Sequence, residues 1–389
     1  MHTFKVGLIG CGVISDIYLQ TFAKFDFIEV IACASLDLQE SRAKAAQYGI
    51  AKACKPDDVI NDPNIDAVLN LTNPIAHAPI NIAALEAGKH VYVEKPFATT
   101  LDDGLATLVT ARKNGLLVGC APDTFLGGRW QTIRKLIDDG KIGKPIGATA
   151  FMCNHGVERH HPNPVNWYKT GGGPLLDMAP YYLTALVSLM GPIKSVCGMS
   201  SRPFKQRLIE SEPRKGELID VEVDTHVSGM LEFVNGATAS MITSFDVWDS
   251  NLPRLEIYGE LGSISVSDPD PVFGPNRFEG SVHFRTRETS RWTYRPRVQG
   301  LDDWEIAENI HGFNEDTRGL GLVDLAYAVR DARAPRASGD LAHHVLDVMM
   351  SILASASDRR FIDIQSTCLQ PEPLPANFPA SETQTLAAE

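Results

Sequence analysis

Residues 4–25 read FKVGLIGCGVISDIYLQTFAKF, and this stretch decides the fold of the first part of the chain. The apolar run Phe4–Ile9 predicts a short buried strand, and a glycine-rich turn follows it directly. Beyond the turn, apolar residues recur at spacings of three and four, which is typical of one face of a helix. A strand, a glycine turn and a helix in this order indicate the first half of a βαβ unit.

The turn itself predicts a dinucleotide site. Gly10 permits the tight turn, and Gly12 lets the backbone approach a pyrophosphate, which then meets the positive end of the helix. Ser15 stands where a third glycine is usual, so strand and helix pack slightly less closely there. A plain turn without a ligand is the alternative. The residues expected to contact the cofactor here are Gly10, Cys11, Gly12, Val13 and Ile14.

The rest of the chain divides into further segments. Strand and helix patterns alternate through residues 1–122, which predicts an α/β fold with a doubly wound parallel sheet of the Rossmann type. Residues 123–364 show longer period-two segments and a hairpin signal at Asn235-Gly236, which predict an α+β domain with an open, largely antiparallel sheet. Residues 365–389 are rich in proline, and we expect an extended and poorly ordered tail.

Composition excludes several classes of partner. The 389 residues are 44% apolar and 22% charged, as in an ordinary soluble protein, and the net charge is −12. An acidic surface argues against nucleic acid or anionic membranes as partners. No apolar run reaches the roughly 20 residues of a membrane span, and no secretory signal pattern opens the chain. Seven widely spaced cysteines without a C-x-x-C motif favour reduced thiols, so we expect a cytoplasmic protein.

The residue after the second predicted strand, Ile28–Ala34, bears on the choice of dinucleotide. Ser35 occupies this position, beside the expected adenosine ribose. A carboxylate here would repel the 2′-phosphate of NADP, whereas serine does not. Asp37, two residues later, can still accept hydrogen bonds from the ribose hydroxyls. The sequence therefore leaves NAD and NADP both open.

Three further motifs mark candidate site residues. Val93-Glu94-Lys95-Pro96 ends a predicted parallel strand at its carboxyl edge, where sheets of this type bind ligands. Proline after Lys95 favours an extended backbone, so that the lysine side chain projects at the tip of the strand. The second motif, GGGPLLDMAPY, spans residues 171–181, and the third, TNPIAH, spans residues 72–77.

Together with the glycine turn, these motifs resemble the Gfo/Idh/MocA family, which includes glucose–fructose oxidoreductase, inositol dehydrogenase and their relatives. The resemblance extends over nearly the whole chain, to about residue 364. It implies a Rossmann domain, an open-faced mixed-sheet domain and a nicotinamide held in the cleft between them. It also implies hydride transfer to or from a secondary carbon of a sugar, cyclitol or similar polyol. A homodimer or homotetramer formed through the open sheet face is expected from the family.

The resemblance also assigns roles to individual residues. Lys95 would contact the reacting hydroxyl and a cofactor ribose, and Asp177 would orient the substrate. Tyr181 stands where the family usually has a histidine that acts as general acid and base. Tyrosine at this place also occurs in relatives of glucose–fructose oxidoreductase and dihydrodiol dehydrogenase, so a dihydrodiol-type substrate stays open. The remaining residues expected near the cofactor are Thr72, Asn73, His77 and Glu94, with a satisfied helix cap as the alternative for His77.

The chemistry explains why these residue types suit the reaction. Removing hydride from an alcohol carbon requires that the hydroxyl proton leave as well, so a positioned base is needed. Free tyrosine has a pKa of about 10 and is too weakly acidic alone, but a nearby ammonium such as that of Lys95 favours the phenolate. Asp177 would keep the ammonium charged and accept bonds from substrate hydroxyls. In the alternative interpretation, Asp177 caps a helix and Tyr181 is a core aromatic.

The local structure around this pair has two possible forms. Asp177 and Tyr181 lie four residues apart, on one face of a helix if both are helical. Pro174 suits the first helical turn, whereas Pro180 does not suit a helix interior. Either the helix begins near Pro180, or a kink at Pro180 re-aims Tyr181.

Softer candidates lie in the segments around the motifs. His161 and Trp167 are expected to face the substrate, although an exposed loop and a core position are the alternatives. Asp123 follows the last predicted strand of the first domain and either points into the cleft or caps a helix. Three histidines within residues 155–161 suggest a metal site, but the family needs none and we expect none.

Two functions of other classes remain as rivals to the dehydrogenase. One is a glycoside hydrolase on the same fold that uses the nicotinamide only transiently. The other is a non-catalytic sensor that binds the cofactor and regulates a partner. The joint presence of Lys95, Asp177 and Tyr181 argues against the sensor.

Overall fold

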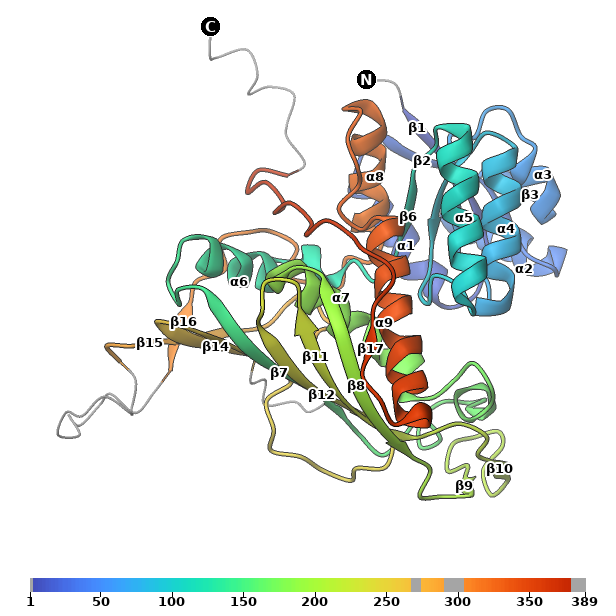
Figure 1. Cartoon of the computed structure of the whole chain (residues 1–389). Helices are drawn as coiled ribbons and strands as arrows, with labels where there is room; N and C mark the ends of the chain where they lie inside the picture. Colours follow the sequence, from blue (N-terminus) through green and yellow to red (C-terminus); the bar gives the residue numbers. More distant parts are fainter. Residues whose placement is uncertain (1–2, 267–273, 290–303, 379–389) are drawn as a thin grey trace, which may run out of the picture.

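The computed structural model describes residues 3–266, 274–289 and 304–378, and Figure 1 shows two sheets with helices packed around them. The first sheet has six strands, all parallel, in the order β3-β2-β1-β4-β5-β6. These strands are β1 (Phe4–Ile9), β2 (Ile28–Ala34), β3 (Lys52–Cys54), β4 (Ala67–Asn70), β5 (His90–Val93) and β6 (Val118–Cys120). The helices between them are α1 (Ile14–Phe22), α2 (Leu38–Tyr48), α3 (Pro56–Ile60), α4 (Pro74–Glu86) and α5 (Leu101–Asn114).

This order confirms the predicted doubly wound parallel sheet. Its strands are buried on both faces, because α4 packs on β4 and β5 while α8 (Leu320–Arg330), from much later in the chain, packs on β5 and β6. Figure 1 shows α8 on the side of the sheet away from α4 and α5. The strand order reverses between β1 and β4, and ligands of such sheets bind at the carboxyl ends of strands at this switch point.

The second sheet has nine strands in the order β16-β15-β14-β13-β7-β12-β11-β8-β17. Only the β7–β12 pair is parallel among its described pairings, which confirms the predicted largely antiparallel sheet. Its strands are β7 (Pro145–Cys153), β8 (Ile193–Ser201), β11 (His226–Phe233), β12 (Thr238–Ser244), β13 (Leu255–Gly259), β14 (Gly262–Val266), β15 (Val282–Thr286), β16 (Glu305–Ala307) and β17 (Ile362–Asp363). A separate two-stranded ribbon consists of β9 (Gln206–Leu208) and β10 (Leu218–Asp220).

Helices cover one face of the nine-stranded sheet. Both α7 (Pro174–Met190) and α9 (Gly339–Asp358) pack on it, and α9 continues upward to β6 and α5 of the first part (Figure 1). Alternate residues of β11 are buried, as the period-two pattern predicted, and the hairpin at Asn235-Gly236 joins β11 to β12. The remaining helices are η1 (Thr124–Leu126), α6 (Gly128–Asp138) and η2 (Val165–Tyr168).

The bounds of helix α7 show whether a helix begins near Pro180 or runs through it. The helix begins at Pro174, directly after Gly173, whose φ of 90° favours glycine, and it continues through Pro180 to Met190. A helix start near Pro180 is therefore wrong. Asp177 in the first turn and Tyr181 one turn later share the same continuous helix.

The described part of the proline-rich tail is extended, but it is docked against the protein rather than loose. Leu374 is buried, and its backbone N–H donates to Gln131 Oε1 at 2.7 Å. The Phe378 ring lies 5.1 Å from the ring of Tyr327 on α8. The rest of the predicted tail, residues 379–389, lies outside the described residues. Within the described ranges, no helix has the length and apolar character needed to cross a membrane.

Candidate active site

The glycine turn after β1 has the geometry of a dinucleotide cradle. Gly10 has a φ of 105°, and a Cβ there would lie 2.6 Å from the backbone carbonyl carbon and oxygen of Leu71, so only glycine fits. At Gly12 a Cβ would meet no atom within 4 Å, which leaves open space above the turn. Val13, at the start of α1, is 90% exposed and provides no side-chain cap. The turn and the free N-terminus of α1 therefore fit a pyrophosphate.

Two side chains of the turn point inward and hold its shape. The Cys11 thiol is buried and donates to the Ala34 carbonyl at 3.4 Å, so only the backbone of Cys11 is placed to contact a ligand. The hydroxyl of Ser15 is buried and donates to the Gly12 carbonyl at 2.6 Å. Ser15, at the position of the third glycine, therefore stabilises the turn through this hydrogen bond.

Two carboxylates, those of Asp37 and Glu40, lie close to the end of β2. The Ser35 hydroxyl donates to Glu40 Oε2 at 2.6 Å, and Asp37 caps α2 by accepting the N–H of Gln39 at 2.8 Å. Lys44, a nearby cation, is bound to Asp16. The sequence analysis missed Glu40, because its closeness to Ser35 depends on how α2 folds back over the end of β2.

The turn after β4 is tied to the segment after β5 through His77. This side chain is fully buried, with Nδ1 2.7 Å from the Pro96 carbonyl oxygen and Nε2 3.0 Å from the Thr72 carbonyl oxygen. Burial lowers the pKa of His77, while the two carbonyl contacts act in the opposite direction. The His77 ring therefore links two loops at the carboxyl edge of the sheet, and its contact with the cofactor stays a prediction. Asn73 remains exposed at the start of α4.

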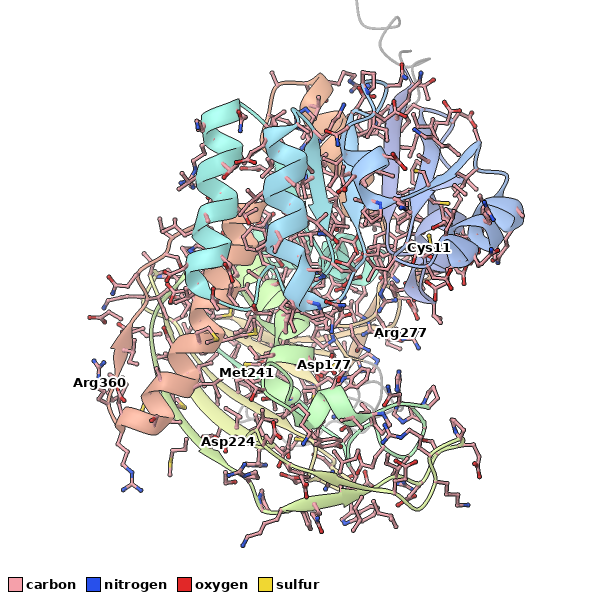
Figure 2. The ribbon with its side chains drawn as sticks, turned by 90° about the vertical axis from the view of Figure 1, so that its right-hand side faces the viewer. Cys11, Asp177, Asp224, Met241, Arg277 and Arg360 are labelled. Carbon is pink, nitrogen blue, oxygen red and sulfur yellow. The ribbon has the colours of Figure 1, made fainter. Side chains whose placement is uncertain are left out.

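The structure brings Lys95, Asp177 and Tyr181 together from the two parts of the chain. Lys95 Nζ donates to Asp177 Oδ1 at 2.8 Å and to the Asp177 backbone carbonyl at 2.7 Å. The same nitrogen lies 5.3 Å from the centroid of the Tyr181 ring, over its face. Figure 2 shows Asp177 at the junction between the parallel-sheet part above and the nine-stranded sheet below.

Pro180 interrupts the hydrogen bonding of α7 close to the contact with Lys95. Proline has no N–H to give to the carbonyl four residues earlier, at Leu176, and its ring disturbs that turn of the helix. The neighbouring carbonyl of Asp177 accepts from the ammonium of Lys95. Pro180 thus lies within one helical turn of the residue that Lys95 binds, and the kink stays a prediction.

The Lys95 ammonium is held in its charged form. Burial alone would lower the pKa of Lys95, but the carboxylate of Asp177 and the nearby oxygens of Tyr181 and Glu94 outweigh burial, so the pKa lies above its ordinary value. An ammonium has three N–H donors, and two of them bind Asp177. Among the residues that the structure describes, Asp177 alone accepts from this ammonium, which leaves the third N–H for a substrate hydroxyl.

Glu94 orients the backbone of this motif. One carboxylate oxygen accepts from the Tyr18 hydroxyl of α1 at 2.8 Å, and the other accepts from the Lys95 N–H at 2.8 Å. Burial, followed by the charge of Glu94, raises the pKa of Tyr18 well above its usual range, so Tyr18 remains a donor. Glu94 therefore connects the dinucleotide helix α1 to the position of Lys95.

Asp123 is buried in the interior, not directed into the cleft as the substrate-contact hypothesis required. It is 1% exposed, and Oδ2 accepts from the backbone N–H groups of Gly319 at 2.9 Å and Gly321 at 2.8 Å. The carboxylate therefore caps α8, the second of the two alternatives, although that helix lies almost 200 residues away in sequence. Burial raises the pKa of Asp123 to about 6, against the two N–H groups and Arg318, which lower it.

The aromatic candidates lie beside the start of α7. The rings of His161 and Trp167 are 4.5 Å apart, and the Trp167 carbonyl accepts the N–H of Gly173 at 2.7 Å. His155 stacks on Trp248 instead, with ring centroids 3.4 Å apart. Within the described ranges, no group of three or more histidine, cysteine, aspartate or glutamate side chains is arranged to hold a metal ion.

Arg318 is a cation near the cluster that no pattern in the sequence indicated. It directly precedes the N-cap of α8, and its guanidinium donates to the Asp316 carboxylate and to the Asn276 carbonyl at 3.2 Å. Burial works to lower the pKa of Arg318, but the nearby groups Tyr181, Asp316 and Glu94 outweigh burial, so the pKa lies above its ordinary value. Residues 308–319 form a polar stretch without periodicity, so no pattern in the sequence pointed to this residue.

Comparisons with known proteins agree with the geometry. A model described as an oxidoreductase family with an NAD-binding Rossmann fold matches residues 4–121, and the GFO/IDH/MocA C-terminal domain matches residues 130–265. Myo-inositol 2-dehydrogenase of Thermotoga maritima is 27% identical over 67% of this chain and 74% of its own length. Levoglucosan dehydrogenase of Pseudarthrobacter phenanthrenivorans is 25% identical over 94% of this chain and 99% of its own length.

A solved structure is similar over nearly the whole fold. Levoglucosan dehydrogenase in complex with NADH and L-sorbose has a TM-score of 0.78 to this chain at 21% sequence identity. The match covers 94% of this chain and 100% of the other. This chain therefore shares its overall fold with levoglucosan dehydrogenase.

Proposed function

Because the chain belongs to the Gfo/Idh/MocA family of oxidoreductases, we propose that it transfers hydride between a nicotinamide dinucleotide and a secondary hydroxyl or carbonyl of a sugar, cyclitol or related polyol. The first part of the chain is an NAD-binding Rossmann domain. Relatives named as an inositol dehydrogenase and a levoglucosan dehydrogenase support the polyol class.

The residues present fit the dinucleotide. The open turn at Gly12 and the free N-terminus of α1 would receive the pyrophosphate, and the region of Ser35 would receive the adenosine ribose. When bound, the nicotinamide supplies the acceptor or donor of the hydride. The carboxylates of Asp37 and Glu40 near Ser35 would repel a 2′-phosphate, which favours NAD over NADP.

Lys95 and Asp177 would bind and orient the substrate. The free N–H of the Lys95 ammonium donates to the oxygen of the reacting carbon, which fixes the position of that carbon. The same positive charge stabilises the negative charge that develops on the oxygen as its proton leaves. The second carboxylate oxygen of Asp177 is available to accept from a neighbouring substrate hydroxyl.

Tyr181 would accept the proton of the reacting hydroxyl during oxidation and return it during reduction. Its ring packs against the Lys95 ammonium, and the phenol is almost fully buried, which limits exchange with bulk water. A positioned base of this kind contributes roughly 10²–10⁴-fold to the rate. This assignment rests on the contact geometry of the cluster.

One observation carries the proposal: the ammonium at the tip of β5 reaches across to α7 and binds Asp177 at 2.8 Å, with Tyr181 one helical turn further on. A lysine, a carboxylate and a phenol in contact beside a dinucleotide turn form the minimum set for binding an alcohol and removing its proton. If the ion pair between Lys95 and Asp177 had only a structural role, the phenol of Tyr181 and the nearby glycine turn would not be needed.

The direct test is absorbance at the band of reduced nicotinamide. A panel of monosaccharides, anhydrosugars, inositols, sugar acids and dihydrodiols is offered with NAD and with NADP. We expect reduction of NAD by a member of the polyol classes and weaker reduction of NADP. Release of an aglycone from glycosides without net nicotinamide reduction would favour the hydrolase instead, and cofactor binding without any turnover would favour the sensor.

A single substitution tests the role of Lys95. Lys95→Met keeps the aliphatic stem and removes the ammonium, so we expect turnover to fall at least about a hundredfold while nicotinamide still binds. Lys113→Met, an exposed lysine in the last turn of α5, serves as the matched control and should keep wild-type turnover. Undiminished kcat in Lys95→Met would contradict the assignment.

A further inference from the structure

A buried ion cluster lies in the second part of the chain, and the proposed reaction uses none of its side chains. Arg207 on β9 has its Nε 3.0 Å from Glu158 Oε1 and its Nη1 3.4 Å from Asp246 Oδ1. These three side chains are all at most 7% exposed. Tyr168, which is fully buried, donates its hydroxyl to the other oxygen of Glu158. Three segments that are far apart in the sequence thus meet around one guanidinium.

The Arg207 guanidinium also binds the backbone of two of these segments. It donates to the carbonyl of His155 at 3.2 Å and to the carbonyl of Phe245. It lies over the ring of Tyr168, 5.6 Å from the ring centroid. A Cβ on Gly156, whose φ is 84°, would lie 2.9 Å from Arg207 Nη2, so glycine is needed for the backbone to pass this closely. Arginine can hold so many partners at once because its planar guanidinium presents five N–H donors.

Tyr168 connects this cluster to η2, of which it is the last residue. The carbonyl of its neighbour Trp167 accepts the N–H of Gly173 at 2.7 Å. A Cβ on Gly172 would lie 2.7 Å from the same carbonyl oxygen. Helix η2 is therefore packed directly against the triple-glycine motif, and the missing side chain of Gly172 is what permits this close approach.

The position of Gly173 in turn determines the position of Asp177. Gly173 is the N-cap residue of α7, and its carbonyl accepts the N–H of Asp177 at 3.1 Å. Asp177, in the first turn of α7, binds the ammonium of Lys95 through its side chain and its backbone carbonyl. Successive contacts therefore run from Arg207 through η2 to the ion pair between Lys95 and Asp177.

We propose that Arg207 is a positioning residue for the candidate active site: its ion cluster fixes η2, and η2 fixes the start of α7 and the carboxylate of Asp177. This inference rests on the proposed function, in which Asp177 orients the substrate, and deepens it. Buried ion pairs often add little net stability compared with apolar side chains of the same size. Their donors and acceptors are satisfied in only one arrangement, however, which suits the cluster to holding a segment in one place.

The charges of the cluster indicate what happens when Arg207 is removed. One guanidinium balances the two carboxylates of Glu158 and Asp246. Without it, two negative charges stay buried with no counter-charge, which is strongly unfavourable. The loop that carries Glu158 gains by moving toward water, and Tyr168 at the end of η2 loses the partner of its hydroxyl when the loop moves.

The effect on the site can be measured at Lys95. Among the described residues, the titratable groups in contact with Lys95 are Asp177 and Tyr181 on α7 and Glu94 directly before it in the chain. A displaced Asp177 leaves the ammonium without its bound carboxylate, so the amine releases its proton at a lower pH. Only a neutral amine reacts with an acylating reagent, and the reactivity of Lys95 should therefore rise.

The test needs no substrate and uses the full-length protein. A short pulse of acetic anhydride acetylates neutral amines, and peptide mass spectrometry gives the acetylation of Lys95 relative to the exposed Lys113 of the same molecule. We expect this ratio to rise at least about threefold in Arg207→Met and at least about tenfold in Asp177→Asn, which removes the charge directly. A wild-type ratio in Arg207→Met would overturn the proposal.

Two further variants separate positioning from a general loss of structure. Arg336→Met breaks a comparable ion pair, with the fully buried Asp324 on α8, and should leave the Lys95 ratio unchanged. An equal rise in Arg336→Met would overturn the local explanation. Tyr168→Phe removes only the hydroxyl that binds Glu158. If Arg207→Met does not fold, Tyr168→Phe decides: a raised ratio supports the proposal, and a wild-type ratio overturns it.

Activity adds a second readout once the nicotinamide panel has identified a polyol. In Arg207→Met, kcat/KM for the polyol should fall at least about tenfold while the KM for NAD stays unchanged, because the displaced Asp177 serves the substrate and not the glycine turn. If no polyol is oxidised but the Lys95 ratio rises, the proposed function fails and the positioning of Asp177 by Arg207 stands. If the wild type oxidises a polyol and the ratio does not change in Arg207→Met, the inference about Arg207 fails alone.

Discussion

At the scale of single residues, Asp123 shows how burial converts an ordinary carboxylate into a pH-sensitive part of the fold. Its oxygen caps α8 through two backbone N–H groups, and burial raises its pKa from 3.8 to about 6. Between these values the folded protein retains the proton that the unfolded chain has released. The free energy of unfolding therefore falls as the pH rises through this window.

We predict that Asp123→Asn changes how the stability of the protein depends on pH. The amide cannot ionise but keeps an oxygen that can accept from Gly319 and Gly321, so its stability should lack this pH dependence. Relative to wild type, the free energy of unfolding of Asp123→Asn should rise by up to about 3 kcal/mol from pH 4 to pH 7. Urea unfolding at a series of pH values measures the difference.

An exposed carboxylate provides the control for that experiment. Asp102 lies in the first turn of α5 and is exposed, so Asp102→Asn should follow the wild-type pH dependence. A difference between wild type and Asp123→Asn that stays constant from pH 4 to pH 7 would show that Asp123 does not hold its proton in the folded state.

At the scale of elements, the turn between β1 and α1 separates two roles of glycine. Gly10 is required by the fold, because its φ is 105° and a Cβ would meet the Leu71 backbone at 2.6 Å. A Cβ at Gly12 would meet no atom within 4 Å, so the fold itself does not require glycine there. The missing side chain instead leaves room for a ligand at the turn. We therefore expect the substitutions Gly10→Ala and Gly12→Ala to have different effects, the first on stability and the second on ligand binding.

We predict that Gly10→Ala lowers the free energy of unfolding by about 1–3 kcal/mol, because the strained backbone and the contact with Leu71 cannot both be relieved. Gly12→Ala should unfold like wild type but bind NADH at least about tenfold more weakly, since its methyl group occupies the approach of the pyrophosphate. Thermal unfolding and NADH fluorescence titration measure the two effects. Wild-type NADH affinity in Gly12→Ala would show that the dinucleotide does not approach this turn.

Another element, α7, shows how one helix serves both packing and chemistry. Its face toward the nine-stranded sheet is buried throughout its second half, which anchors the helix. Its first two turns carry Asp177 and Tyr181 toward the tip of β5, where Lys95 binds the side chain and the backbone carbonyl of Asp177. Anchoring one half of the helix in the core fixes the geometry of the other half at the site.

At the scale of the whole molecule, the open face of the nine-stranded sheet is the expected oligomer interface. Among the described residues, α7 and α9 cover only the opposite face. On the open face Met199 is 76% exposed and Met230 is 49% exposed, on neighbouring strands β8 and β11. Apolar side chains gathered on one face of a sheet are typical of a surface that another copy covers.

We predict that the wild-type chain forms a homodimer or homotetramer in solution and that Met199→Glu combined with Met230→Glu shifts it toward the monomer. Buried like charges across a symmetric interface would repel each other. Analytical ultracentrifugation measures the masses. Leu105→Glu on α5, an equally exposed apolar residue elsewhere, is the control and should keep the wild-type mass. A monomeric wild type would contradict the prediction.

The parallel sheet, the mixed sheet and the hairpin at Asn235-Gly236 were predictable because each depends on local patterns: apolar periodicity, glycine turns and chain order. The meeting of Lys95 with α7 joins distant residues, and it was predictable only because the short motifs around them resemble those of a known family. The positions of Asp123 and His77 were predicted less well. Both side chains satisfy backbone groups distant in sequence, and a sequence pattern does not show which distant group a polar side chain will find.

The sequence by itself thus determined where a dinucleotide can bind and which three side chains form the candidate catalytic cluster. Only the tertiary structure decided that α8 returns from the far end of the chain to the first sheet, where the buried carboxylate of Asp123 binds the start of the helix. The physical reason is that strands, turns and helices are specified by neighbouring residues. The partners of a buried charge, by contrast, are fixed only when separate elements pack and exclude water from around it.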